Sequence, residues 1–348
     1  MNNIQYLLVL HSIDGLGPIR LKAILDYFKD PKLAWEASGS ELLKIGIPKA
    51  VVDLLVETRK KLDPQKYLED IQKSGIKWMT IFDENYPKLL KQIYDPPIVL
   101  YYKGNVECLD KKCIAVVGTR KMTGNGRSLT EQFVKNLVEA GLTIVSGLAR
   151  GIDAVAHKTT VEANGQTVAV LGSGLNEIYP PENKGLAQEI INGHGAIISE
   201  FPPDYPIFPG NFPIRNRIIS GLSLAVLVVE AAEDSGSLIT AREALEQGRD
   251  VFTIGQIDSI KDGAMTVFEP GEILDEMGIF YKQSQADLTN LSDEERQVLQ
   301  ILENENMHID EIGKKMEISA AKISATLLKM EIAGLVQNIG SGNYCRFR

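Results

Sequence analysis

The sequence predicts an α/β protein whose main domain is a doubly wound parallel sheet, with an all-helical domain before it and a small domain of helices and a hairpin after it. In the middle of the chain, short apolar runs bounded by glycine alternate with amphipathic helices, which is typical of parallel strands covered on both faces. Both ends of the chain show helical spacing instead. The length of 348 residues, with 44% hydrophobic and 24% charged residues, fits two or three globular domains.

Residues 1–64 are predicted to form the helical domain. The turns Gly15-Leu16-Gly17 and Ile45-Gly46-Ile47 precede helices expected over 19–28 and 50–60, an arrangement typical of SAM-like and helix-hairpin-helix-like modules. Amides at a helix start could contact the backbone of DNA. A packing or protein-contact role is the alternative, and we favour it.

Residues 65–110 are expected to form a bridging segment with a helix over 67–74 and extended segments over 78–82 and 98–102. Its prolines mark turns and do not make a flexible linker.

Residues 111–283 carry the predicted sheet. Its strands are expected at 114–117, 143–146, 167–171, 196–199, 225–229 and 251–254, with helices between them, for example over 129–139 and 184–191. Strands that are almost continuously Val, Ile and Leu indicate a Rossmann-like fold, buried on both faces.

Residues 288–348 are predicted to form a winged helix. Helices expected over 293–303, 309–316 and 319–330 are followed by a hairpin that turns at 340–343. Ser319 is the expected N-cap of the helix that would enter a major groove.

Composition excludes several classes of function. No apolar run is long enough to span a membrane and the first residues show no signal sequence, so we expect a cytoplasmic protein. The three cysteines and four histidines show no metal-ligand spacing, so neither a metal nor a cofactor is predicted. The net charge of −9 means that any contact with nucleic acid must come from a local cluster of basic residues.

The loops that follow the predicted strands carry the residues suited to bind a polyanion. Glycines let backbone amides approach an anion at a helix start, arginines donate in a fork that fits phosphate, and an aromatic ring can stack on a base. The carboxyl ends of parallel strands meet at one edge of the sheet, where ligands bind. The candidate DNA-binding residues are Gly118, Thr119, Arg120, Ser146, Gly147, Arg150, Gly172, Gly174, Phe212, Arg215, Asn216, Arg217, Ser235, Gly236, Ser237 and Arg242.

Our mechanistic hypothesis places Arg120, Arg215 and Arg217 in one basic pocket that neutralises the phosphates of a single strand. The expected amide donors are Gly147, Gly172 and Ser235 to Ser237.

Four segments in this region read A-V-V-G-T-R at 115–120, S-G-L-A-R-G-I-D at 146–153, N-F-P-I-R-N-R-I-I-S-G-L at 211–222 and S-G-S-L-I-T-A at 235–241. Together they resemble the bacterial DNA processing protein A (DprA/Smf) family. The helical and winged ends of the chain also resemble domains that many members carry. The resemblance implies a non-enzymatic homodimer that binds incoming single-stranded DNA in natural transformation, protects it and helps to load a RecA-type recombinase.

Carried onto this sequence, the resemblance assigns backbone binding to Arg120 and to the Arg-Asn-Arg run at 215–217. Members often have a lysine after the third strand, where this chain has Pro181, and Lys184 is the nearest substitute. The segment at 256–262 is shorter than is usual in the family.

Two other functions are alternatives to single-stranded DNA binding. A nucleotide N-glycoside hydrolase would hold a phosphate on a glycine-rich turn beside a Glu and an Arg, but only Ser235 to Thr240 partly imitates its Pro-Gly-Gly-x-Gly-Thr signature. A winged-helix transcription regulator would need a basic recognition helix, whereas 319–330 offers only Lys322 and Lys329. We therefore expect protein contacts from the winged domain, with duplex binding as the alternative.

Overall fold

The computed structural model describes residues 3–232, 235–255, 260, 263–279, 291–303, 306–332, 335–340 and 342–346. The chain divides into two compact units, residues 1–279 and 280–348. The predicted α/β class, the helical N-terminus and the C-terminal winged helix are all confirmed. Residues 256–259 and 261–262, which make up most of the shortened segment, lie outside the described residues.

Six helices form the N-terminal part of the first unit. Three of them start at side-chain caps, because Asp30, Ser38 and Asp63 each accept a hydrogen bond from an amide of the first turn. The helices are α1 (Ile4–His11), α2 (Pro18–Phe28), α3 (Pro31–Glu36), α4 (Gly39–Lys44), α5 (Lys49–Lys61) and α6 (Pro64–Lys73). The helices expected over 19–28 and 50–60 are therefore present, each one residue longer at its start.

One nine-stranded sheet forms the centre of the first unit, in the order β1-β2-β6-β5-β4-β3-β7-β8-β9. The six strands from β3 to β8 lie where the sequence predicts them, and all neighbours from β6 to β9 are parallel. The strands are β1 (Lys77–Thr80), β2 (Val99–Gly104), β3 (Cys113–Val117), β4 (Thr143–Ser146), β5 (Thr167–Val170), β6 (Gly195–Ser199), β7 (Ala225–Val228), β8 (Asp250–Ile254) and β9 (Ala264–Val267).

The segment expected as a bridge, 65–110, is part of this sheet. β1 pairs with β2 and β2 pairs with β6, both antiparallel, with Tyr101 opposite Ser199. The N-terminal helices share one hydrophobic core with the sheet, and the imidazole Nδ1 of His11 lies 3.3 Å from the hydroxyl of the fully buried Tyr101. The helical module is thereby fixed to the end of the sheet that carries β1 and β2.

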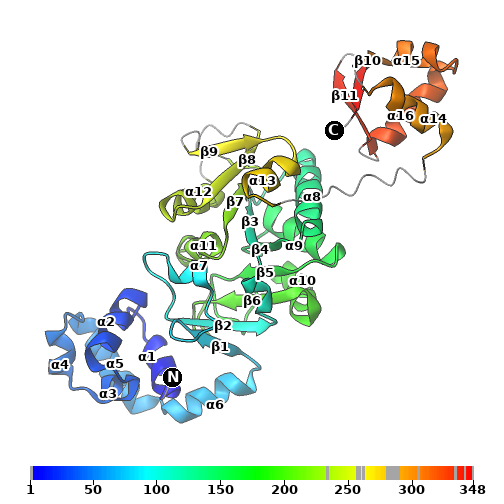
Figure 1. The fold of residues 1–348 in the computed structure, drawn as a ribbon. Helices are drawn as coiled ribbons and strands as arrows, with labels where there is room; N and C mark the ends of the chain where they lie inside the picture. Colours follow the sequence, from blue (N-terminus) through cyan, green and yellow to red (C-terminus); the bar gives the residue numbers. More distant parts are fainter. Residues whose placement is uncertain are drawn as a thin grey trace. The chain divides into compact units, whose positions relative to one another are not determined.

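Helices cover both faces of the sheet. Figure 1 shows α8 (Gly124–Glu139), α9 (Ile152–Glu162) and α10 (Lys184–Glu189) on one side, and α11 (Asn211–Gly221) and α12 (Gly236–Glu246) on the other. The remaining helices of this part are α7 (Lys88–Lys91) and α13 (Pro270–Glu276). The chain order reverses at β3, with β4, β5 and β6 to one side and β7, β8 and β9 to the other, which places the ligand-binding crevice beyond the carboxyl end of β3.

The second unit has its own core, formed by α14 (Asp293–Ile301), α15 (Ile309–Lys315) and α16 (Ala320–Ile332) against three short strands. β11 (Val336–Gly340) and β12 (Asn343–Arg346) form the expected hairpin, and β10 (Met307–His308) pairs with β12. Ser319 accepts a hydrogen bond from the amide of Lys322 at its side-chain oxygen (3.4 Å), as expected of an N-cap. In the described part of both units, no helix is long and apolar enough to cross a membrane.

Candidate nucleic-acid interface

Four side chains form a row at the carboxyl edge of the sheet, in which two adjacent aromatic rings lie between two arginines. The guanidinium carbon of Arg120 lies 5.5 Å from the ring centre of Phe212, the rings of Phe212 and Tyr179 are 5.7 Å apart, and the guanidinium carbon of Arg150 lies 6.0 Å from the Tyr179 ring. Both arginines are exposed and both rings are half-buried. We call these four residues the cation–aromatic row.

Tight packing of the loops positions the first half of the row. The amide of Thr119 donates to the carbonyl of Glu230 (2.7 Å), and the amide of Ile152 donates to the carbonyl of Thr119 (3.2 Å), so the loop that carries Arg120 is fixed on two sides. Phe212 is the second residue of α11 and lies against Gly172, where an added Cβ would be 2.9 Å from the Phe212 ring. The lack of a side chain at Gly172 therefore leaves room for the Phe212 ring.

A second set of contacts positions Arg150. The side-chain amide of Asn183 donates to the carbonyl of Leu148 (2.8 Å), a residue at φ 54° in the loop between β4 and α9. Arg150 forms an ion pair with Glu182 through its Nε, and its guanidinium lies over the Tyr179 ring. The Arg150 guanidinium holds the pKa of Glu182 below its ordinary value, so the carboxylate is charged at neutral pH.

Arg215 is not part of this surface, and its predicted role is wrong. Its residue is only 3% exposed, and its Nη1 donates to the carbonyls of Gly147 (2.7 Å) and Val170. Burial lowers its pKa to about 10, and the nearby Asp153 carboxylate opposes that effect. The Gly147 amide donates to Asp153 (3.1 Å), so this predicted amide donor also faces inward.

Arg217 is also buried, and the predicted single basic pocket is therefore wrong. Its guanidinium contacts Glu200, with 2.5 Å from Nη2 to Oε2, and Asp95, with 3.0 Å from Nε to Oδ2. Desolvation raises the pKa of the buried Glu200. The buried Glu200 and the partly exposed Asp95 thus both pair with this arginine, whose side chain is only 7% exposed.

A carboxylate already occupies the start of α8, the helix that follows Arg120. The Thr123 side chain caps the helix by accepting from the Gly126 amide (2.9 Å), and the Glu230 side chain accepts from the Thr123 amide (3.0 Å). Gly118 leaves room for the Glu230 carbonyl and Ile152 to pack close. A negative charge at the N-terminus of a helix is stabilising, and at α8 the Glu230 carboxylate supplies that charge.

The other candidate residues fall into two groups: some hold the loops together through internal hydrogen bonds, and others are exposed on the surface. Ser146 donates to the carbonyl of Val116 (2.7 Å), and the Gly174 amide donates to the carbonyl of Tyr205 (3.0 Å). The Asn216 side chain donates to the carbonyl of Gly236 (3.1 Å).

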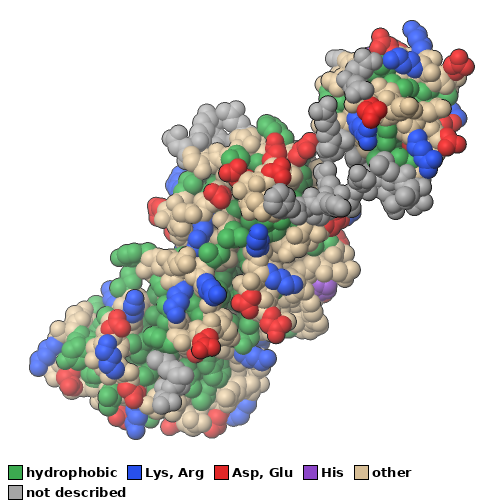
Figure 2. Space-filling view, in the orientation of Figure 1, with side chains coloured by type: hydrophobic (Ala, Val, Ile, Leu, Met, Phe, Trp, Pro, Cys, Tyr) green, Lys and Arg blue, Asp and Glu red, His purple; other side chains and the backbone are tan. Residues whose placement is uncertain are grey.

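The turn before α12 is also partly closed by internal hydrogen bonds, because the Ser237 amide donates to the Ser235 hydroxyl oxygen (3.4 Å). Lys184 and Arg242 are exposed cations outside the row. Figure 2 shows Lys and Arg side chains over the middle of the first unit, with acidic side chains among them.

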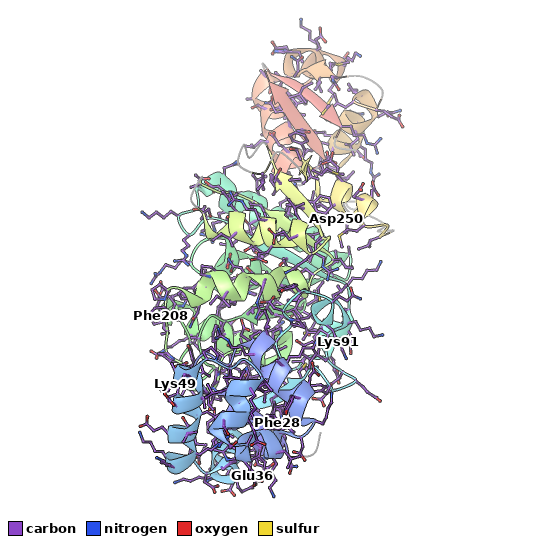
Figure 3. All side chains as sticks on the ribbon, turned by 90° about the vertical axis from the view of Figure 1, so that its left-hand side faces the viewer. Phe28, Glu36, Lys49, Lys91, Phe208 and Asp250 are labelled. Atoms are coloured by element: carbon purple, nitrogen blue, oxygen red, sulfur yellow. The ribbon has the colours of Figure 1, made fainter. Side chains whose placement is uncertain are left out.

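The residue set predicted from the sequence missed two members of this surface, Tyr179 and Glu182. An aromatic in a predicted ligand loop was the available signal for Tyr179, the same signal that selected Phe212. Phe208, 62% exposed in the loop before α11, is a further exposed aromatic, and Figure 3 shows it at the outer edge of the first unit. Within the described residues, no group of three or more His, Cys, Asp or Glu side chains could hold a metal ion.

Comparison with known proteins gives matches along most of the chain. The family model described as DNA recombination-mediator protein A matches residues 77–278, and the DprA winged helix domain matches residues 282–341. Protein Smf of Synechocystis is 34% identical over 391 aligned residues that cover 98% of both chains. Protein Smf of Escherichia coli is 36% identical over 359 residues that cover 95% of both.

Two solved structures are similar as well. DNA processing protein A (DprA) from Streptococcus pneumoniae superposes with a TM-score of 0.68 at 35% identity, covering 79% of this chain and 99% of that one. DNA processing protein A from Helicobacter pylori, whose structure is described in terms of a single-stranded DNA binding mode, gives a TM-score of 0.52 at 31% identity and covers 58% of this chain and 95% of that one.

Proposed function

Because the chain belongs to the DprA/Smf family of DNA processing proteins, we propose that it is a cytoplasmic protein that binds single-stranded DNA along the cation–aromatic row. The row is the observation that carries the proposal. Exposed guanidinium groups bind phosphates, and rings stack on bases of any sequence. The relative from Helicobacter pylori, described as binding single-stranded DNA, supports the same substrate.

Within this proposal the candidate residues have different roles. Arg120 and Arg150 contact phosphates, Phe212 and Tyr179 stack on bases, and the exposed Lys184 and Arg242 extend the basic surface. The buried residues hold the loops in place. They are Ser146, Gly147, Gly172, Gly174, Arg215, Asn216 and Arg217, together with the half-buried Gly118.

The proposal includes a homodimer. β9 is the last strand of the described sheet, and Met265 in this strand and Phe268 directly after it are 44% and 70% exposed. A strand edge that no other described strand pairs with, and that carries apolar side chains, is suited to pair with a second copy. Protection of the bound strand and loading of a RecA-type recombinase complete the proposed function, and they rest on membership of the family.

We propose no catalytic step. Hydrolysis of an N-glycosidic bond would need a carboxylate that reaches a bound nucleotide. Glu200 is buried against Arg217, and Glu230 is occupied at the start of α8. Glu182, the exposed carboxylate beside the row, is paired with Arg150, so each of the three carboxylates has a partner, which supports a binding function over hydrolysis.

The test is the salt dependence of binding to a fluorescent oligo-dT compared with a duplex. Arg120→Ala and Phe212→Ala should each weaken binding to oligo-dT and to mixed sequence equally, and Arg120→Ala should also reduce the salt slope because one phosphate contact is lost. Lys158→Ala is the control, because Lys158 is an exposed cation of α9 paired with Glu162. Equal binding by all four proteins would refute the proposal.

A further inference from the structure

We propose that Glu182 is an internal competitor for DNA phosphate: it pairs with Arg150 in the free protein and is displaced when a strand binds, so it limits affinity at low salt. This inference rests on the proposed function, because it assigns a phosphate to Arg150 in the same row. It makes Glu182 a residue that tunes binding without touching DNA.

The contacts of Arg150 show how its charge is occupied. Its Nε is paired with Oε1 of Glu182, and its guanidinium lies over the Tyr179 ring, 6.0 Å from the ring centre. Both side chains of the pair remain accessible, at 51% and 46% exposure. A phosphate from solvent can therefore reach Arg150, but it must replace a carboxylate to bind at Nε.

The two ends of the row differ in this respect. Arg120 lies over Phe212 with no carboxylate of the described residues in ion-pair distance, whereas Arg150 carries its own counter-charge. The guanidinium of Arg120 can bind a phosphate directly, whereas that of Arg150 must exchange the Glu182 carboxylate for the phosphate. Of these two exposed arginines, therefore, only Arg150 has an affinity for phosphate that a single acidic side chain, Glu182, can control.

The position of Glu182 is built into the fold. It lies in a short 3-10 helix (Pro181–Asn183), and the next residue, Asn183, donates from its side chain to the carbonyl of Leu148 (2.8 Å). Leu148 and Arg150 belong to the same loop. This hydrogen bond from the Asn183 side chain brings the Glu182 carboxylate to Arg150 and does not depend on the ion pair, so removing the charge of Glu182 should leave the loop in place.

The size of the effect follows from the exposure of the pair. Exposed ion pairs are weak, so neutralising Glu182 should tighten binding roughly two- to fivefold at low salt. Salt screens exposed charges, so the gain should shrink as the ionic strength rises.

The experiment compares oligo-dT affinity across a salt series for the unmodified protein, Glu182→Gln, Arg150→Ala and the double variant. Glu131→Gln is the matched control, because it removes the same charge from another exposed Arg–Glu pair, Arg127–Glu131, with exposures of 54% and 46%. We expect tighter binding for Glu182→Gln alone, no gain for Glu131→Gln, and no gain from Glu182→Gln once Arg150 is absent.

Several outcomes would overturn the inference. An equal gain in both Glu→Gln variants would mean that only net charge matters, and a gain that persists without Arg150 would mean that Glu182 acts elsewhere. Weaker binding by Glu182→Gln would mean that the carboxylate holds Arg150 in its binding position. Failure of the proposed function looks different, because the unmodified protein would then not bind oligo-dT at all.

Discussion

Arg217 and Glu200 form an ion pair inside the first unit, with 2.5 Å between Nη2 and Oε2 and less than a tenth of either side chain exposed. The same guanidinium reaches Asp95, which lies in the connection between β1 and β2. One arginine of α11 therefore joins the end of β6 to a loop that precedes β2. This contact explains why an arginine chosen as a DNA ligand is a structural residue.

Removing that arginine should destabilise the fold. Arg217→Met leaves Glu200 buried without its partner, and breaking a buried pair in this way costs about 3–5 kcal/mol of unfolding free energy. Denaturant unfolding measures the loss. Arg242→Met, a change at an exposed cation, should stay within about 0.5 kcal/mol of the unmodified protein. Lost DNA binding with unchanged stability would contradict the structural role.

His157 should make stability fall in acid. Burial, and after it the charge of Arg215, lowers its pKa from 6.5 to about 3, and its Nδ1 lies 2.7 Å from the hydroxyl of Thr167. Between these two values the unfolded state binds the proton and the folded state does not, so stability decreases as the pH falls through this window.

The measurement is the unfolding free energy at several pH values. The contribution of His157 is at most about 1.4 kcal/mol per pH unit, and His157→Gln should lose it while the buried carboxylates continue to titrate. Identical pH profiles for the two proteins would show that the imidazole is not kept neutral by the fold.

Gly172→Ala should weaken DNA binding without contact to DNA. The new methyl would lie 2.9 Å from the Phe212 ring and would push it out of the row. We expect a loss of about 1–3 kcal/mol in oligo-dT binding, which is the contribution of one base–aromatic stack. Gly185→Ala is the control, since nothing lies within 4 Å of a Cβ there. Unchanged affinity for Gly172→Ala would remove Phe212 from the interface.

Phe268→Glu should separate the proposed dimer. Phe268 is 70% exposed after β9, and a charge there opposes burial against a second copy. Light scattering at micromolar concentration should report a monomer. Phe82→Glu is the matched change, because Phe82 is 51% exposed after β1 at the opposite end of the sheet. A dimer that survives Phe268→Glu would place the interface elsewhere.

The strands were predictable from the sequence because burial on both faces leaves an unbroken apolar run. β4 was predicted at its observed bounds, and β3, β5, β6, β7 and β8 within one residue at either end. β9 has no such run, because Met265 and Thr266 are exposed. It joins the sheet through backbone pairing with β8, which leaves little trace in the pattern of side chains.

The roles of the arginines were not predictable from residue types alone. Arg215 and Arg217 are two positions apart on α11, and side chains at that spacing point to different faces of a helix. They could not line one pocket, and the structure places Arg215 under the loop after β4 and Arg217 beside β6. The spacing of the two arginines on a helix was enough to predict that they point to different faces. Their partners were not predictable, because they come from distant parts of the chain.

The pairing of β2 with β6 limits how the protein can be shortened. A fragment that began at residue 111 would keep every parallel strand but would uncover the hydrogen-bonding groups of β6 from Ala196 to Ser199. Bare strand edges recruit other chains, so such a fragment should aggregate during purification. A fragment that is to stay in solution should therefore retain β1 and β2, together with the helices that pack on them.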